Sequence, residues 1–317
     1  MDRRSFIQGV GGLVAVSALP AFGADDPAQF ASRGRFERLM LAYRHIDIGL
    51  PAPFSVLHIS DTHLTAASPH EPPEKQALRE ERTRTFGGRQ EEALADSLAW
   101  AKANADYVLH TGDLIDWQSE ANFDLVRRHY GAIALGTMGN HEFSPSMWRS
   151  VPKEEPTEAW KDRSRAALSA VYPFDISFHA QTVRGVNFVM LDDVYGTVTA
   201  RQVERFAAEV RKGLPIVLCL HVPFFTEHIW RANEKFWRNP GKPFSSAAIG
   251  DPRGDYRRQL DDAVTRDFIA SLRGERLLKG ILAGHLHIAV EDGFSTTAMQ
   301  YVVGGNFMFH GQEILFT

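Results

Sequence analysis

Short apolar runs alternate along the chain with longer stretches in which apolar residues recur every three or four positions. The apolar runs predict β-strands at 54–60, 107–110, 132–135, 176–178, 186–191, 216–220, 280–282, 298–303 and 313–316. The periodic stretches predict amphipathic helices at 90–103, 122–130, 158–171, 199–211 and 262–272. Thr199 and Gln202 have the spacing of a capping box at the start of one helix. Strands that alternate with helices predict a layered α/β fold.

Three stretches lack a sustained period. Residues 25–52 predict an irregular lead-in with one short strand, and the Pro- and charge-rich residues 66–84 predict a long surface loop. Residues 224–258 carry many aromatic side chains among charges, which fits either a packed surface excursion or a cap over a ligand site. We favour a substrate cap, because aromatic loops beside polar groups commonly form ligand pockets.

Composition narrows the class of protein only slightly. The 317 residues are 44% hydrophobic and 23% charged, as in ordinary globular proteins. The net charge of −4 provides no basic footprint, so we expect no stable nucleic-acid partner. The single cysteine, Cys219, excludes an intrachain disulfide and lies in an apolar run that predicts a buried structural thiol.

The N-terminus has the features of an export signal. Arg3 and Arg4 precede a weakly apolar, Gly- and Ala-rich stretch from Gly9 to Leu19, which resembles a bacterial twin-arginine signal. We expect a signal peptide at 1–24, a domain at 25–317, a periplasmic or secreted protein, and contact with the Tat translocase during export. The alternative is a membrane anchor, but the stretch falls short of the roughly 20 apolar residues that a span needs.

Polar clusters follow five of the predicted strands. They are Asp61-Thr62-His63, Gly112-Asp113-Leu114-Ile115-Asp116, Gly139-Asn140-His141-Glu142, His221, and Gly284-His285-Leu286-His287. In open α/β sheets ligands bind beyond the carboxyl ends of the strands, so these clusters are expected in one crevice. Bringing carboxylates and imidazoles together in one crevice costs free energy unless bound groups neutralise the charges and engage the lone pairs. A pair of cations would do both.

The ordered clusters resemble the signature of the calcineurin-like metallophosphoesterase family. That signature, D-x-H…G-D-x-x-D…G-N-H-[DE]…H…G-H-x-H, appears as DTH, GDLID, GNHE, the His of HVP, and GHLH. The resemblance covers the chain from Phe54 to about Phe316. It implies a single-domain, four-layer α/β/β/α sandwich and a dinuclear-metal-dependent hydrolase that cleaves phosphoester bonds.

The resemblance also implies a ligand for each metal position. Asp61, His63 and His287 would bind one metal ion, Asn140, His221 and His285 the other, and Asp113 would bridge both. Such mixed carboxylate, amide and imidazole ligands suit two divalent or trivalent transition-metal ions, namely Mn, Fe, Zn or Co. A metal-bridging hydroxide would attack phosphorus.

The leaving group would take its proton from the chain. The resemblance implies that His141 donates this proton and that Asp116 orients the His141 imidazole, although Asp116 could instead cap the turn after Asp113. Purple acid phosphatases have a metal-binding Tyr at the position of Asp116, so Fe(III)–tyrosinate chemistry is not expected. Glu142 is expected to support its loop or a helix start rather than to bind metal.

Other polar residues match no motif position. His58 and His110 precede the ligand clusters on strands, where a buried, hydrogen-bonded imidazole is expected. Asp192 and Asp193 end another predicted strand and are candidates for support behind the ligands.

Several functions remain open at this point. We expect a small-molecule phosphoester substrate, with phosphodiesters preferred because the aromatic segment could hold an apolar leaving group. The alternatives are a phosphomonoesterase of the same fold and a non-catalytic module that binds metal or phosphate. A single-zinc peptidase is disfavoured, because the chain has no H-E-x-x-H run.

Overall fold

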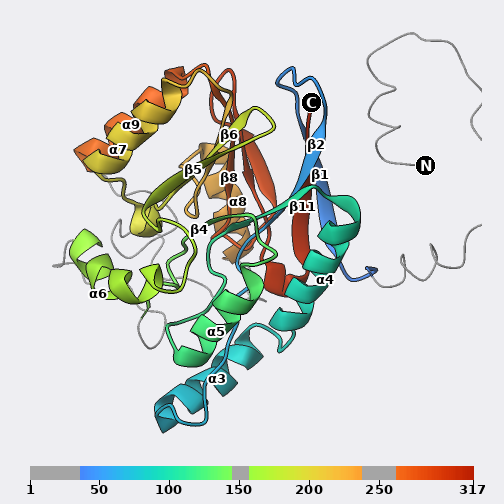
Figure 1. Ribbon diagram of the computed structural model, residues 1–317, viewed down its shortest axis with the longest axis vertical. Coiled ribbons are helices and arrows are strands. Elements are labelled where there is room, and N and C mark those ends of the chain that lie inside the picture. Colours follow the sequence, from blue (N-terminus) through green and yellow to red (C-terminus); the bar gives the residue numbers. More distant parts are fainter. Residues whose placement is uncertain (1–35, 145–156, 238–261) are drawn as a thin grey trace, which may run out of the picture. The chain divides into compact units, whose positions relative to one another are not determined.

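The predicted apolar runs form the strands of two β-sheets (Figure 1). The structure is a computed structural model that describes residues 36–144, 157–237 and 262–317. Residues 38–317 make one compact unit, which confirms a single α/β domain there. The predicted signal peptide at 1–24 and residues 238–258 of the predicted cap lie outside the described residues.

The first sheet has the strand order β1-β11-β2-β3-β4. Its strands are β1 (Met40–Ile46), β2 (Phe54–Ile59), β3 (Tyr107–Thr111), β4 (Leu135–Thr137) and β11 (His310–Phe316). β3 runs parallel to both β2 and β4, whereas β11 is antiparallel to β2. The carboxyl ends of β2, β3 and β4 therefore meet at one edge of the sheet, and the first three polar clusters follow them.

The second sheet has the strand order β5-β6-β7-β8-β10-β9. Its strands are β5 (Phe178–Val183), β6 (Val186–Leu191), β7 (Ile216–Cys219), β8 (Leu278–Ala283), β9 (Val290–Gly293) and β10 (Met299–Val302). β6, β7 and β8 are parallel neighbours, so their carboxyl ends also share an edge. His221 follows β7, and the cluster at 284–287 follows β8.

Helices flank the two sheets. They are α3 (Pro73–Thr85), α4 (Gln90–Asn104), α5 (Glu120–His129), α6 (Thr157–Ser169), α7 (Ala200–Val210), α8 (Glu227–Trp237) and α9 (Ala263–Gly274), with 3₁₀ turns η1 (Val194–Gly196) and η2 (Asn306–Met308). Figure 1 shows α7 and α9 beside the second sheet, and α4 and α5 beside the first. The four-layer α/β/β/α architecture is confirmed. None of the described helices combines the length and the apolar character needed to cross a lipid bilayer.

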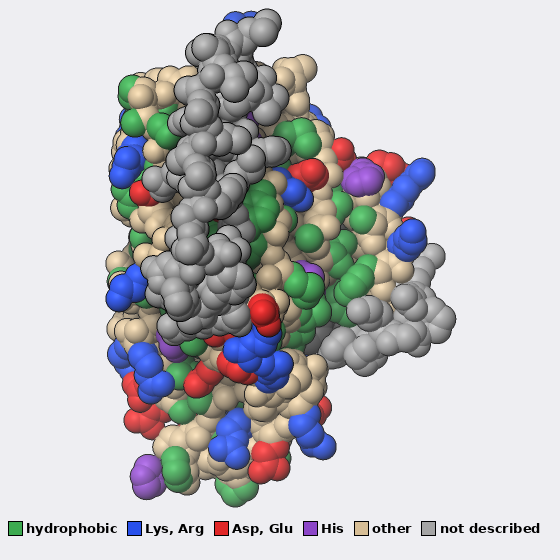
Figure 2. All heavy atoms as spheres, turned by 90° about the vertical axis from the view of Figure 1, so that its right-hand side faces the viewer, with side chains coloured by type: hydrophobic (Ala, Val, Ile, Leu, Met, Phe, Trp, Pro, Cys, Tyr) green, Lys and Arg blue, Asp and Glu red, His purple; other side chains and the backbone are tan. Residues whose placement is uncertain are grey.

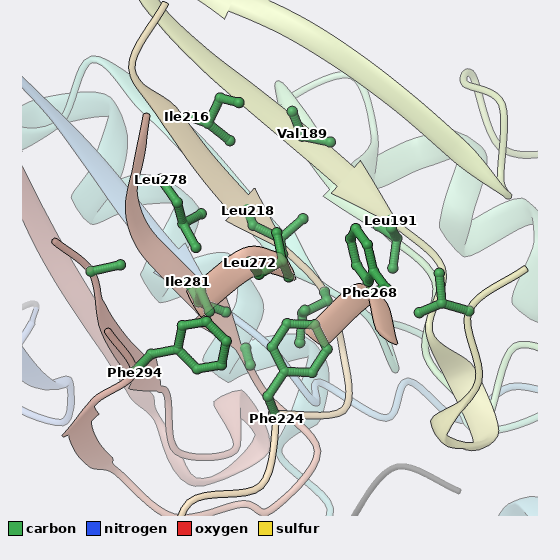
Figure 3. Packing of buried hydrophobic residues seen from close by; sticks show 14 of the residues in the cluster. Val189, Leu191, Ile216, Leu218, Phe224, Phe268, Leu272, Leu278, Ile281 and Phe294 are labelled. Carbon is green, nitrogen blue, oxygen red and sulfur yellow. The ribbon is translucent and has the colours of Figure 1, made fainter. Parts of the chain in front are cut away.

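Two apolar cores hold the layers together. Between the sheets, Phe54 stacks on Phe316 with ring centroids 5.0 Å apart, and Phe188 of the second sheet packs against both rings. Outside the second sheet, Phe268 and Leu272 of α9 pack over apolar strand residues (Figure 3). Because both faces of this sheet are buried, its central strands are apolar at nearly every position.

The surface carries charges of both signs. On the face drawn in Figure 2, Lys and Arg side chains are interspersed with Asp and Glu side chains among the described residues. This distribution agrees with the small net charge of −4.

Several boundaries differ from the prediction. Residues 66–84 are not one long loop, because α3 occupies Pro73–Thr85 and buries Leu78. The predicted strand at 132–135 occupies 135–137, and that at 176–178 occupies 178–183. The edge strand β9 was not predicted. Of the predicted cap, residues 227–237 form the helix α8.

Two predicted details are confirmed. Thr199 and Gln202 form both hydrogen bonds of a capping box at the start of α7. Both strand histidines are fully buried and hydrogen-bonded: His58 Nε2 lies 2.8 Å from Thr111 Oγ1, and His110 Nε2 lies 2.9 Å from Thr62 Oγ1.

His58 is expected to make the protein sensitive to acid. Burial, together with neighbouring His110, lowers its pKa from 6.5 to about 3. As the pH falls, this histidine is therefore protonated in the unfolded chain before it is protonated in the folded chain. The free energy of unfolding keeps its full value above pH 6.5 and decreases as the pH falls towards 3. We expect His58→Gln to reduce that loss by about 1.4 kcal/mol per pH unit. Urea unfolding at pH 7, 6 and 5 measures the slope; the exposed His45→Gln should leave it unchanged, and equal slopes for all three proteins would contradict the assignment.

Candidate metal centre

The structure brings together all seven residues that the sequence predicted as metal ligands. One group joins Asp61, His63 and His287, whose candidate ligand atoms all lie within 4.8 Å of one another. His63 Nε2 lies 3.0 Å from His287 Nε2, which in turn lies 3.3 Å from Asp61 Oδ1. Two ring nitrogens and a carboxylate oxygen thus converge on one point from β2 and β8.

A second group forms beside the first. The candidate ligand atoms of Asp113, His221 and His285 also lie within 4.8 Å of one another. His221 Nε2 lies 3.1 Å from His285 Nδ1 and 3.2 Å from Asn140 Oδ1. The amide oxygen of Asn140 thereby completes this group.

Asp113 lies between the two groups. Its Oδ2 atom is 3.3 Å from His221 Nε2 and 3.8 Å from His63 Nε2. Its Oδ1 atom accepts a hydrogen bond from the backbone N–H of His141 at 2.9 Å. One oxygen of the carboxylate is therefore anchored, while the other faces both groups, as a bridging ligand requires.

The electrostatics of this cluster favour a bound cation. Burial alone would lower the pKa of His221, but Asp113 and Asp61 raise it to about 10. Burial would likewise raise the pKa of Asp113, but the imidazoles of His221 and His141 hold it well below its usual value. The carboxylates thus attract positive charge, and the donor set of carboxylate, amide and imidazole fits intermediate transition metals.

The backbone at the ligands is unusual. Five of the seven candidate ligands have left-handed φ angles: Asp61 (55°), His63 (51°), Asp113 (55°), His285 (68°) and His287 (58°). Non-glycine residues rarely adopt this conformation, and where they do so they cluster at functional sites. The sharp turns after β2, β3 and β8 depend on it to direct these side chains into the centre.

Two glycines permit the first sheet's loops to touch. A Cβ atom on Gly112 would lie 2.6 Å from the backbone nitrogen of Gly139, and one on Gly139 would lie 2.1 Å from Asp113 Oδ1. Real Cβ atoms do not approach other atoms so closely. The glycines before Asp113 and Asn140 are therefore required by the approach of two strand ends.

We expect Gly139→Ala to displace the Asp113 carboxylate and to weaken metal binding about 10–100-fold, as loss of support behind a ligand typically does. Metal content after dialysis against a graded series of chelator concentrations measures the effect. Gly131→Ala is the matched control, because a Cβ there meets nothing within 4 Å. Equal metal retention by the two variants would contradict the close approach seen at Gly139.

Asp116 lies behind two imidazoles. Its Oδ1 atom is 2.8 Å from His141 Nδ1 and 3.0 Å from His63 Nδ1. His141 Nε2 points to the opposite side and lies 3.9 Å from Asp113 Oδ2. The predicted orientation of His141 by Asp116 fits this geometry, and Asp116 holds a candidate ligand as well.

Glu142 joins two loops. Its buried carboxylate accepts hydrogen bonds from the backbone N–H groups of Asp113, Leu114, Ile115 and Gly139 and from the hydroxyl of Tyr172. Among the described residues it belongs to none of the groups that could hold a metal ion, in agreement with a supporting role. Burial raises its pKa to about 7.

The end of β6 supports the second group. Asp193 Oδ1 accepts hydrogen bonds from the backbone N–H groups of His221 and Val222, both at 3.1 Å. Tyr195, itself in the left-handed conformation, donates its hydroxyl hydrogen to the carbonyl oxygen of Asn140 at 3.2 Å. Asp192 instead pairs with the buried Lys161 at 3.0 Å. Asp193 is thus the one of the two aspartates that supports a candidate ligand directly.

Sequence reasoning missed several residues that border the centre. The Phe86 ring stacks on His63 with centroids 4.2 Å apart, and Phe307 lies edge-on to His287 at 5.2 Å. Arg82 forms an ion pair with Asp116 at 2.6 Å. No motif marks these residues. Trp237 also borders the centre, because its ring centroid lies 5.9 Å from that of His287. The sequence did signal this residue, through the many aromatic side chains of the segment after His221.

Solved structures give distant likenesses. A dimetal phosphatase from Danio rerio is 14% identical with a TM-score of 0.44, covering 80% of this chain and 88% of its own. A 5'-nucleotidase from Candida albicans is 13% identical with a TM-score of 0.39, covering 84% of this chain and 47% of its own. A NAD nucleotidase from Haemophilus influenzae is 13% identical with a TM-score of 0.33, covering 80% of this chain and 45% of its own. At this distance such likenesses say nothing of substrate.

The family is shown by the sequence itself. No curated protein matches the chain. Residues 54–289, however, match the family model described as calcineurin-like phosphoesterase, and this span includes every polar cluster of the centre. The chain therefore belongs to the calcineurin-like phosphoesterase family.

Proposed function

We propose that this protein is a metal-dependent phosphoric ester hydrolase with two metal ions. The observation that carries the proposal is the position of Asp113, whose Oδ2 atom faces His63 of one ligand group and His221 of the other. Two cations held close together repel each other, and a shared carboxylate between them offsets that repulsion. Asp61, His63 and His287 would hold one ion, and Asn140, His221 and His285 the other.

The metal ions and the chain would divide the chemistry. Two such ions would neutralise phosphate charge and would lower the pKa of a bound water molecule. His141 would protonate the oxygen of the leaving group, since its Nε2 atom faces the centre while Nδ1 lies on Asp116. Burial lowers the pKa of His141, but Asp113 and Asp116 together raise it above its usual value. Asp116, which is not a candidate metal ligand, would remain its partner when Asp113 holds metal.

Phosphodiesters are the preferred substrates in this proposal. Phe86, Phe307 and Trp237 surround the two histidines of the first ligand group, with ring centroids 4.2 to 5.9 Å from an imidazole. An apolar second ester group would find contacts there that a monoester lacks. Residues 224–258 would act as the substrate cap to which Trp237 belongs. A phosphomonoesterase of the same fold is the alternative.

Hydrolysis of two model esters tests the proposal. The protein is loaded in turn with Mn, Fe, Zn or Co, its metal content is measured, and bis-p-nitrophenyl and p-nitrophenyl phosphate are offered separately. Faster hydrolysis of the diester supports the preferred substrate class, and faster hydrolysis of the monoester supports the alternative. If protein with two metals per chain hydrolyses neither ester, the chain is better described as a non-catalytic metal- or phosphate-binding module.

We also propose export through the twin-arginine route, with residues 1–24 as the signal peptide. The paired Arg3 and Arg4 carry this part of the proposal. Cell fractionation in a bacterial host checks it: the protein should reach the periplasm, and the double change Arg3→Lys with Arg4→Lys should hold it in the cytoplasm. Equal export of both forms would exclude the route.

A further inference from the structure

Arg82 extends from α3 into the centre. Its Nε donates a hydrogen bond to Asp116 Oδ2 at 2.6 Å, and its Nη2 donates one to Asp116 Oδ1 at 3.0 Å. These two parallel bonds match the planar guanidinium to the planar carboxylate. Only 18% of the Arg82 side chain is exposed, although α3 is otherwise strongly polar. The side chain thus belongs to the centre rather than to the surface.

The Asp116 carboxylate that Arg82 binds also contacts two imidazoles. Asp116 Oδ1 lies 3.0 Å from Nδ1 of His63, a candidate metal ligand, and 2.8 Å from Nδ1 of His141, the candidate proton donor. A carboxylate that could rotate about its Cβ–Cγ bond would lose this shared geometry. The two bonds from Arg82 oppose such a rotation, so the orientation of both imidazoles depends on Arg82 through Asp116.

A second contact fixes the same residues. The guanidinium carbon of Arg82 lies 4.9 Å from the centroid of the Phe86 ring, and that ring is nearly parallel to His63, at 6°. Arg82 therefore reaches His63 by two routes, through the carboxylate and through the aromatic ring. Both routes begin in the segment from α3 to Phe86, which carries none of the family's signature residues.

Holding the Asp116 carboxylate in one orientation requires arginine rather than any other cationic side chain. Asp116 is fully buried, so its charge is costly unless it is paired and hydrogen-bonded. Lysine would supply the charge as a single point, whereas the guanidinium supplies charge and a fixed fork of donors. The fork is the part that can hold the carboxylate in one orientation.

We propose that Arg82 is a positioning residue: by clamping Asp116, it aligns His63 for metal binding and His141 for proton donation. The proposal rests on the proposed function: on its metal site for the role of His63, and on its proton donor for the role of His141. It makes α3 part of the functional centre.

The test compares variants on one helix. Arg82→Met removes the fork and keeps an unbranched side chain, Arg82→Lys keeps the charge, and Arg84→Met is the matched control on the exposed side of α3. We expect Arg82→Met to weaken metal retention against chelator and to lower kcat, each about 10–100-fold. Arg82→Lys should be folded by circular dichroism yet remain impaired in both respects. Arg84→Met should match the wild type.

A double variant separates positioning from general stability. If Arg82 acts through Asp116, adding Arg82→Met to Asp116→Asn should cost far less than Arg82→Met costs alone. Full additivity, wild-type metal retention in Arg82→Met, or complete recovery in Arg82→Lys would each overturn the clamp. Wild-type protein that binds two metals without hydrolysing esters would count against the proposed function alone, since metal retention still tests the clamp.

Discussion

Asp113→Asn is expected to lower kcat about 10³-fold or more and to leave fewer than two metal ions per chain. Asparagine keeps the shape of the side chain but removes the charge that faces both ligand groups. Two metal ions supply several kcal/mol of transition-state stabilisation, and each 1.36 kcal/mol corresponds to a tenfold change in rate. Metal analysis and ester hydrolysis, both made on dialysed protein, measure the two effects.

The matched control is Asp124→Asn, which changes an exposed aspartate on α5 that pairs only with Arg127 among the described residues. It should keep both the metals and the activity. If Asp113→Asn kept two metals and near-normal kcat, Asp113 would not be the bridging ligand and the division into two ligand groups would have to be abandoned.

His141→Gln is expected to keep both metal ions and to lose about 10²–10⁴-fold in kcat on esters with alkyl leaving groups, the usual contribution of general acid catalysis. The loss should be much smaller on p-nitrophenyl esters, because p-nitrophenolate is stable without a proton. A series of esters with graded leaving groups shows the change as a steeper dependence of rate on leaving-group pKa.

His70→Gln, at an exposed histidine, controls for the change of residue type. An equal loss on all leaving groups would argue that His141 positions the substrate rather than donates a proton. If the His141→Gln variant lost a metal ion, His141 would belong among the metal ligands. Its Nε2 atom lies 3.9 Å from Asp113 Oδ2, which is close enough for this outcome to need a direct test.

The centre could be predicted from sequence because its residues follow strands. A parallel strand places whatever follows it at a shared edge, so the clusters after β2, β3 and β4 could be assigned to one edge and those after β7 and β8 to another. The pattern of apolar positions carried that information. The meeting of these two edges, which belong to different sheets, was implied by the family resemblance and not by the strands. The conformation of each turn was not needed for the prediction, although the left-handed backbone there proves essential to the geometry.

Helix α3 and strand β9 could not be predicted for a different reason. α3 buries little apolar surface, so no amphipathic pattern marks it, and Arg82 finds its partner 34 positions further along the chain. The contact of Arg82 is with a distant residue, for which local sequence contains no signal. β9 is a polar edge strand that, among the described strands, pairs only with β10. β10 is nearby in the chain, but the β9 sequence Val-Glu-Asp-Gly lacks the apolar run that predicts a strand.

The left-handed backbone of the ligands has a consequence for folding. Holding residues such as His63 or His285 in this conformation costs on the order of 1–3 kcal/mol each, a cost that glycine avoids. His63→Gly would nevertheless leave a cavity beside Phe86 and remove a partner of the buried Asp116 carboxylate, because the His63 imidazole is fully buried, stacks on Phe86 and lies 3.0 Å from Asp116. The packing of the ligand side chain therefore offsets the strain of its own turn, so His63 serves the fold as well as the metal centre.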